Sequence, residues 1–290
     1  MTLVFITLLG ATVNGALGYG FSSIVVPLAL MFFSNRVLNP ALVLIEVVLN
    51  GYVLFVNRSS IPLVWKRVMP IIVGLVPGVL LGTVLLSRVS PAWMKLSTFA
   101  VLVPLILLQA AGFRRPIRSE RQAGLLFGGG LGVLYSITTI SGPPLAVALS
   151  NQGFAKREFR AALGLVRLAE ATFTAIAYYS TGLIAAPSLR LIPLIAPSVL
   201  LGVPLGALVV RSIRVETFRR ICMSFDAWIV AFGCSALLRE LRLVEGPASY
   251  GVLIAVGATD VWLLYRFFSA KDEPAALGTV RPAVLNQPAS

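Results

Sequence analysis

Residues 14–28, NGALGYGFSSIVVPL, place helix-weakening residues inside a segment, 2–33, that is otherwise strongly apolar. The stretch contains three glycines, two serines, an asparagine, a tyrosine and a proline. Glycine permits backbone angles that other residues avoid, and an interior proline removes an N–H group and clashes with the preceding turn. We therefore expect a helix that breaks within GALGYG, residues 15–20, and restarts as a second helix.

A second stretch has the same character. Residues 136–144, SITTISGPP, interrupt the apolar segment 121–153, and neither Pro143 nor Pro144 can continue a helix. Both segments exceed the roughly 20 residues that a membrane span needs. Irregular backbone at membrane depth survives only where it is buried in protein or lines a polar cavity. The pattern predicts that each segment is a broken or re-entrant helix.

The composition is far more apolar than that of a soluble domain. Of the 290 residues, 58% are hydrophobic and 12% are charged, against about 45–50% and about 25% in soluble domains. This predicts an all-α polytopic membrane protein. The net charge of +13 reflects Lys and Arg in short loops, which set topology and indicate no nucleic-acid partner. The expected segments are 2–33, 37–57, 68–87, 92–113, 121–153, 161–183, 189–210, 216–238 and 247–268.

The two interrupted segments belong to a weak internal repeat. A shift of 124 residues superimposes Arg36 on Arg160 and Glu46 on Glu170, and the same offset serves from residue 18 to residue 95. We expect two repeats of about four helical segments, followed by an extra helix. The expected units are repeat one at 1–113, a basic cytoplasmic linker at 114–122, repeat two at 123–240, an extra transmembrane helix at 247–268 and a disordered cytoplasmic tail at 271–290.

The Lys and Arg residues of the loops indicate how the chain crosses the membrane. If all nine segments span, the two sides carry 10 and 13 basic residues, which decides nothing. If segments 2–33 and 121–153 return to their own side, the sides carry 6 and 17. The positive-inside rule then places the N-terminus outside and the C-terminus in the cytoplasm. Each repeat would cross three times, so the halves would be inverted, as in many secondary transporters.

The restarting helices are the strongest candidates for a binding site. A helix N-terminus offers unpaired N–H groups and a partial positive charge, which suit an anion. Two such ends meeting at the midplane would form an anion site, whereas the alternative is that the glycines only permit close helix packing. The candidate substrate-binding residues are Asn14, Gly18, Tyr19, Gly20, Phe21, Ser22, Ser23, Asn50, Ser141, Gly142, Pro143, Pro144 and Arg167.

Three charged residues lie deep in apolar segments, where a charge costs about 2.5–3.5 kcal/mol on insertion scales. Glu46 and Glu170 occupy the same repeat position and are the candidates for coupling to an ion. Arg167 precedes Glu170 by three residues, within reach of an ion pair in the same helix. Two interpretations of Arg167 stay open: a ligand for a small oxyanion, or a partner that neutralises Glu170.

Other small and polar residues are assigned to helix packing or receive no role from the sequence. The glycine pairs Gly78/Gly82 and Gly202/Gly206 have the spacing that brings membrane helices into close contact, and we assign them to packing. Asp226 and Asp260 lie in the last two segments, outside the paired repeat positions, and the sequence gives them no role.

The paired motifs resemble those of the TauE/SafE sulfite-exporter family. GALGYGFSSIVVPL in the first half and SITTISGPPLAVALSNQG in the second carry the resemblance, together with helices that begin at Arg36 and Arg160. The first motif has GYG where the family often has a run of glycines, and the second lacks its leading glycine. The resemblance covers residues 1 to about 240. It implies a two-fold repeat and export of sulfite or an organosulfonate such as sulfoacetate.

We therefore expect a secondary transporter that works by alternating access and is coupled to protons or sodium. An anion channel of the same architecture and a carrier of a non-sulfur anion stay open as alternatives. We expect no enzyme, because the chain has no histidine and no paired aspartates in a protease-like motif. No cofactor or metal is expected. The expected setting is the inner cell membrane, with lipid around the chain, and the sequence leaves a homodimer open.

Overall fold

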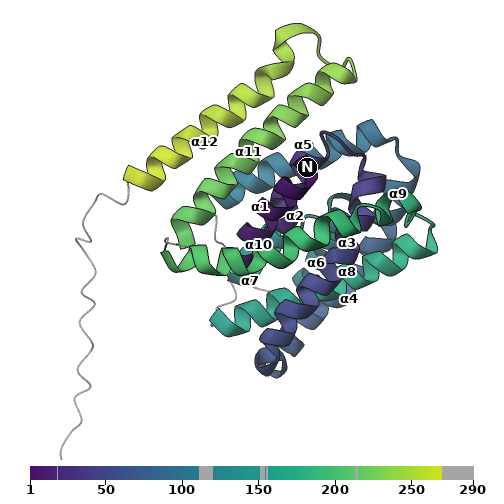
Figure 1. Ribbon diagram of the computed structural model, residues 1–290, viewed down its shortest axis with the longest axis vertical. Helices are drawn as coiled ribbons and strands as arrows, with labels where there is room; N and C mark the ends of the chain where they lie inside the picture. Colours follow the sequence, from purple (N-terminus) through teal and green to yellow (C-terminus); the bar gives the residue numbers. More distant parts are fainter. Residues whose placement is uncertain (18, 111–119, 151–153, 155, 213–214, 270–290) are drawn as a thin grey trace, which may run out of the picture.

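The structure is a computed structural model that describes residues 1–17, 19–110, 120–150, 154, 156–212 and 215–269. Most of the predicted linker, the predicted tail and Gly18 lie outside this part of the chain. All regular elements of the described residues are helices (Figure 1). They are α1 (Thr2–Leu17), α2 (Phe21–Ala29), α3 (Asn35–Val56), η1 (Arg58–Ser60), α4 (Ile61–Arg88), α5 (Pro91–Ala110), α6 (Glu120–Thr138), α7 (Gly142–Ser150), α8 (Lys156–Ser180), α9 (Ala186–Leu189), α10 (Ile192–Ser212), α11 (Val215–Glu240), η2 (Gly246–Tyr250) and α12 (Gly251–Ser269).

The predicted membrane character is confirmed. Within the described residues, five helices are long and apolar enough to cross a bilayer: Asn35–Val56, Arg58–Arg88, Arg157–Ser180, Ala186–Gly206 and Gly246–Ser269. The 22 residues of α3 extend about 33 Å at 1.5 Å per residue, slightly more than the hydrocarbon core. The chain is a multi-pass, all-α membrane protein.

Both predicted helix breaks are present. The first lies between the end of α1 at Leu17 and the start of α2 at Phe21. Gly20 has a φ of 105°, a left-handed conformation that glycine adopts without the cost of a side chain. The two arms are unequal, with 16 residues in α1 and nine in α2, so the break is not central.

Segment 2–33 turns back on itself at this break. A Cβ built on Gly10 of α1 would lie 2.6 Å from Val25 Cγ2 and 2.9 Å from the Phe21 carbonyl oxygen, both in α2. In a continuous helix, Gly10 and Val25 would be about 22 Å apart at 1.5 Å per residue. The first segment is therefore folded into a helical hairpin, and its return to the same side of the membrane stays a prediction.

The second break separates α6, which ends at Thr138, from α7, which begins at Gly142. Proline is favoured at the first helical position, and Pro143 follows directly after this start. Thr139 takes the left-handed conformation here, with a φ of 56°. The nine residues of α7 pack against α8 and α5. This short helix is about 14 Å long, too short to cross a bilayer.

The contacts between helices of the first and second halves occur in equivalent pairs. Helix α1 packs along α10, and α6 packs along α4; likewise α2 contacts α11, and α7 contacts α5. The contacts between α3 and α8 and between α5 and α11 join equivalent elements. A two-fold relation between the halves would produce these pairs. The inverted repeat stays a prediction, which this pairing supports.

The glycine pairs lie where helices touch, as predicted. A Cβ on Gly78 of α4 would lie 2.1 Å from the Gly129 carbonyl oxygen of α6. A Cβ on Gly206 of α10 would lie 1.9 Å from the Thr12 carbonyl oxygen of α1. Only hydrogen fits at these positions, so the glycines bring the helix backbones into direct contact.

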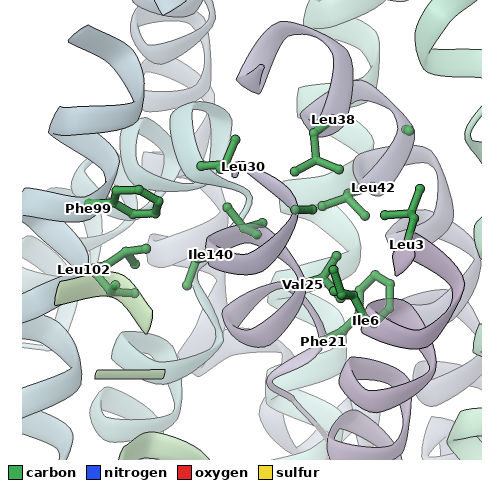
Figure 2. Packing of buried hydrophobic residues seen from close by; sticks show 14 of the residues in the cluster. Leu3, Ile6, Phe21, Val25, Leu30, Leu38, Leu42, Phe99, Leu102 and Ile140 are labelled. Carbon is green, nitrogen blue, oxygen red and sulfur yellow. The ribbon is translucent and has the colours of Figure 1, made fainter. Parts of the chain in front are cut away.

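An apolar core surrounds the first hairpin (Figure 2). Phe21 and Val25 of α2 are fully buried and belong to one cluster with Leu42 of α3 and Leu102 of α5. Ile140, from the break between α6 and α7, belongs to the same cluster. The core therefore fixes α2 and the second break in one packed unit.

Helices α11 and α12 form a hairpin at one edge of the bundle (Figure 1). Asp260 of α12 is fully buried against α11. It accepts hydrogen bonds from Ser224 Oγ at 3.0 Å and Trp228 Nε1 at 3.3 Å, and it lies 3.8 Å from Arg220 Nη2. Asp260 thus holds the extra helix in place. The side chain of Asp226 lies outside the described part.

Candidate functional site

The two helix breaks meet. A Cβ on Gly142, the first residue of α7, would lie 3.2 Å from Tyr19 Cβ and 3.7 Å from the Gly20 nitrogen. A small, mainly apolar pocket lies between the same elements, and its lining is Ser23, Leu102, Ile106, Ile140, Pro143 and Pro144. The predicted site residues from the first and second halves are therefore neighbours in space.

The two helix starts differ in the hydrogen-bond donors they can offer. At α2, the N–H groups of Phe21, Ser22 and Ser23 precede the first intrahelical bond, from Ile24 to the Gly20 carbonyl. At α7, two of the first three residues are prolines, which have no N–H. The start of α2 is therefore the richer donor for an anion, and α7 contributes mainly its dipole.

Side chains from α3 and α8 accommodate the end of α6 inside the protein. Asn39 and Asn35 of α3 donate to the Ile137 carbonyl at 2.6 and 3.3 Å, and the Tyr178 hydroxyl of α8 donates to the Ser136 carbonyl. Thr138 Oγ1 accepts from the Ile140 N–H at 3.0 Å. A helix leaves its last carbonyls without intrahelical partners, and these groups supply them. The break is thus stabilised by specific side-chain hydrogen bonds.

Glu46 of α3 is the centre of the polar network. It is fully buried and accepts hydrogen bonds from three side chains: Ser22 Oγ at 2.5 Å, Tyr135 OH at 2.7 Å and Arg167 Nη2 at 3.0 Å. These donors come from α2, α6 and α8 respectively. Both oxygens of this carboxyl group therefore have donors, and one of the donors is cationic.

Arg167 forms its ion pair with Glu46, not with Glu170. The Arg167 side chain is 2% exposed, and its Nη2 lies 3.0 Å from Glu46 Oε1. Among the described residues, its Nε and Nη1 have no hydrogen-bond partner. The local ion pair that the spacing of Arg167 and Glu170 allowed is not formed, because Nη2 makes the tertiary contact between α8 and α3 instead. Two donor nitrogens stay available to a ligand.

Glu170 has fewer partners than Glu46. It is fully buried, and its Oε2 accepts a hydrogen bond from Ser141 Oγ, at the residue before α7. Its Oε1 is buried with no donor in the described part of the chain. Each glutamate is thus linked to a serine at one of the two breaks.

The internal repeat is not in strict register. The offset of 124 residues aligns the two glutamates, whereas the helix starts at Phe21 and Gly142 differ by 121 residues.

Further buried polar atoms surround this network. Asn50, one helical turn after Glu46, has an unpaired Nδ2, and Thr174, one turn after Glu170, has an unpaired Oγ1 within the described residues. Asn14, near the end of α1, has an unpaired Oδ1. Buried polar groups without partners are rare in proteins, so this concentration marks a place where a ligand or water can bind.

Sequence reasoning missed Tyr135, Tyr178, Asn35 and Asn39. Tyrosine in a membrane segment most often lies at an interface, whereas Tyr135 and Tyr178 are fully buried donors. The spacing of polar residues along two helices could have indicated them. Helix α3 carries polar residues at 35, 39, 46 and 50, and α8 carries them at 167, 170, 174 and 178. These spacings place each set on one helix face, and the two helices pack together.

One comparison with known proteins identifies a family. The family described as Sulfite exporter TauE/SafE matches residues 3–232, which include both breaks and all three buried charges of the site. Searches of curated proteins and of solved structures returned no match. The match ends before α12, in agreement with a helix added to the repeated core. Because the matched region spans most of the chain, the protein belongs to the sulfite exporter TauE/SafE family of membrane transporters.

Proposed function

We propose that this protein is a secondary transporter that exports sulfite or a small organosulfonate across the inner cell membrane. The anion binds between the two helix breaks, at the start of α2 and beside Arg167. The observation that carries the proposal is the buried Arg167 guanidinium, whose Nε and Nη1 lack partners in the described residues. Its Nη2 is anchored through Glu46 to Ser22, the second residue of α2. Cationic donors and a helix N-terminus therefore belong to one network.

The chemistry of this network suits a small oxyanion. Arginine binds oxyanions through several N–H groups in a fixed plane, and unpaired N–H groups at the start of α2 add further donors. The surroundings are otherwise small or apolar, including Gly20, Gly142 and Pro143. A sulfonate or sulfite group has oxygens for each of these donors. The family supports a sulfur-containing anion over other anions of the same size.

The unequal packing of the two halves supports alternating access. Helix α8 packs closely along α4, but its counterpart α3 touches α10 at few positions. If the two halves are related by a two-fold axis, such a difference means that the packing is tight on one side of the site and loose on the other. Exchange of the two arrangements would move access from one membrane face to the other. If both interrupted segments return to their own side, loop charges favour the N-terminus outside and the C-terminus in the cytoplasm.

Counterflow in proteoliposomes tests the proposal. Vesicles loaded with unlabelled sulfite receive a trace of labelled sulfite outside. A carrier accumulates the label transiently above its equilibrium level, because exchange is faster than net flux. Arg167→Ala is expected to abolish accumulation, whereas Arg190→Ala, an exposed arginine outside the site, retains it. Net flux without counterflow would indicate a channel, and no flux of any sulfur anion by a folded protein would refute the proposal.

A further inference from the structure

The two glutamates at the repeat position have unequal surroundings. Glu46 accepts three hydrogen bonds, and both of its oxygens have partners. Glu170 accepts one, from the neutral hydroxyl of Ser141, and its buried Oε1 has none within the described residues. Two carboxyl groups that look equivalent in the sequence therefore differ in how well their charge is stabilised.

The charged and titratable groups around Glu170 can be named by element. Arg167 lies on the same helix and pairs with Glu46 of α3, and α6 contributes Tyr135, which donates to Glu46. Helix α7 provides no titratable side chain in its described residues. The remaining neighbours, η1 and α4, carry titratable side chains only toward their ends, namely Arg58, Lys66, Arg67 and Arg88.

This inventory leaves one buried negative charge too many. Two ionised glutamates and one guanidinium give a net charge of −1 away from water. An isolated ionised carboxylate is so costly in such a setting that the group takes up a proton instead. Glu46 has the cation and two further donors, so the proton belongs on Glu170.

We propose that Glu170 is the proton carrier of the transporter, and that its protonated Oε1 donates a hydrogen bond to the bound anion. This inference rests on the proposed function and names its coupling ion. Glu46 is instead a positioning residue that holds Arg167 toward the start of α2. Glu170 lies on the same helix as Arg167, and its carboxyl group accepts a hydrogen bond from Ser141 at the second break. A proton on it removes the charge that would repel an anion and adds a donor.

The proton and the anion therefore bind to the same state of the protein. By linkage, anion affinity falls as the pH rises through the range in which Glu170 loses its proton, by up to about tenfold per pH unit. A neutral side chain with donor capacity at position 170 imitates the protonated state. Glu170→Gln is thus expected to bind the anion and to lose the dependence on pH.

Infrared difference spectroscopy tests the proton location without any substrate. Spectra of the purified protein are recorded over a pH titration. The carbonyl stretch of a protonated, buried carboxylic acid is expected in the wild type and in Arg190→Ala at neutral pH, and absent in Glu170→Gln. A spectrum unchanged by Glu170→Gln, or a band lost only in Glu46→Gln, would overturn the inference. This result does not depend on whether sulfur anions are transported.

The second test measures affinity for thiosulfate and methanesulfonate, whose charges do not change between about pH 6 and about pH 9. The wild type and the exposed control Arg190→Ala are expected to bind more weakly as pH rises, and Glu170→Gln with constant affinity. A wild-type slope retained in Glu170→Gln would overturn the inference. If neither anion binds, the proposed substrate class fails, and the infrared result alone decides the proton carrier.

Discussion

Arg167 of α8 and Glu46 of α3 form a buried ion pair at 3.0 Å across 121 residues of sequence, and this pair joins the two halves of the protein. Glu46 also holds Ser22 of α2 and Tyr135 of α6. One carboxylate thus connects a helix break, both central helices and the first helix of the second half. The anion site that we propose depends on this connection.

Removing either partner of the pair is expected to destabilise the protein. Breaking a buried ion pair leaves an uncompensated charge and costs about 3–5 kcal/mol. A double-mutant cycle of Glu46→Gln with Arg167→Met, measured by thermal unfolding in detergent, is expected to give a coupling energy of about 1–3 kcal/mol. The matched cycle of Glu170→Gln with Arg167→Met is expected to be closer to additive. Larger coupling to Glu170 would contradict the observed pairing.

The close contact of α4 with α6 predicts opposite effects at two glycines. Gly78→Ala would place a methyl group 2.1 Å from a backbone oxygen of α6, so the helices must separate and stability must fall. Gly130→Ala in α6 meets nothing within 4 Å and is expected to stabilise by up to about 1 kcal/mol, because alanine favours the helix. Thermal unfolding of both variants checks this prediction. Equal effects at the two sites would exclude backbone contact as the reason for Gly78.

The break after α6 is expected to depend on Asn39. Asn39→Ala removes the 2.6 Å donor to the Ile137 carbonyl and leaves it the longer bond from Asn35 at 3.3 Å, so a loss of about 1 kcal/mol is expected. Asn57→Ala is the matched control, because its 2.8 Å bond to the Val53 carbonyl lies at the partly exposed end of α3. Its cost is expected to stay within about 0.5 kcal/mol. An equal loss of stability in both variants would contradict the role given to Asn39.

The hairpin fold of the first segment makes a definite topological prediction. In a variant without Cys222 and Cys234, single cysteines at Thr2, Phe32 and Ser59 are labelled by an impermeant reagent on intact cells. Residues 2 and 32 are expected to react from outside, and residue 59 only from the cytoplasm. The 22 residues of α3 separate the last two positions. Labelling of 2 and 32 on opposite sides would mean that segment 2–33 crosses the membrane.

The sequence allowed prediction of the features that depend on local chemistry. Glycine and proline mark backbone conformations, so both breaks were found to within a residue, and the spacing of Gly78 and Gly82 predicted their packing. The partner of Arg167 was not predictable in this way, because spacing along one helix shows what is near in that helix only. Glu46 is distant in sequence and becomes a neighbour through the packing of α3 on α8.

The polar network shows the same limit. Tyr135 and Asn39 have no unusual local sequence, and tyrosine in a membrane segment most often lies at an interface. Their role depends on where α6 ends relative to α3, which is a property of the assembled bundle. The difference between Glu46 and Glu170 arises for the same reason, since the neighbours that stabilise Glu46 come from three other helices.

The most direct test of the anion site is thermal stabilisation of the purified protein by sulfite, sulfate, thiosulfate, sulfoacetate, taurine and chloride. A ligand that binds the native state at a hundredfold excess over its Kd adds about 2.7 kcal/mol of stability. We predict a selective rise of the unfolding temperature with a sulfur oxyanion or sulfonate, retained in Arg190→Ala and lost in Arg167→Ala. A rise that survives in a folded Arg167→Ala, or no rise with any of the six, would contradict a site built on Arg167 and the two breaks.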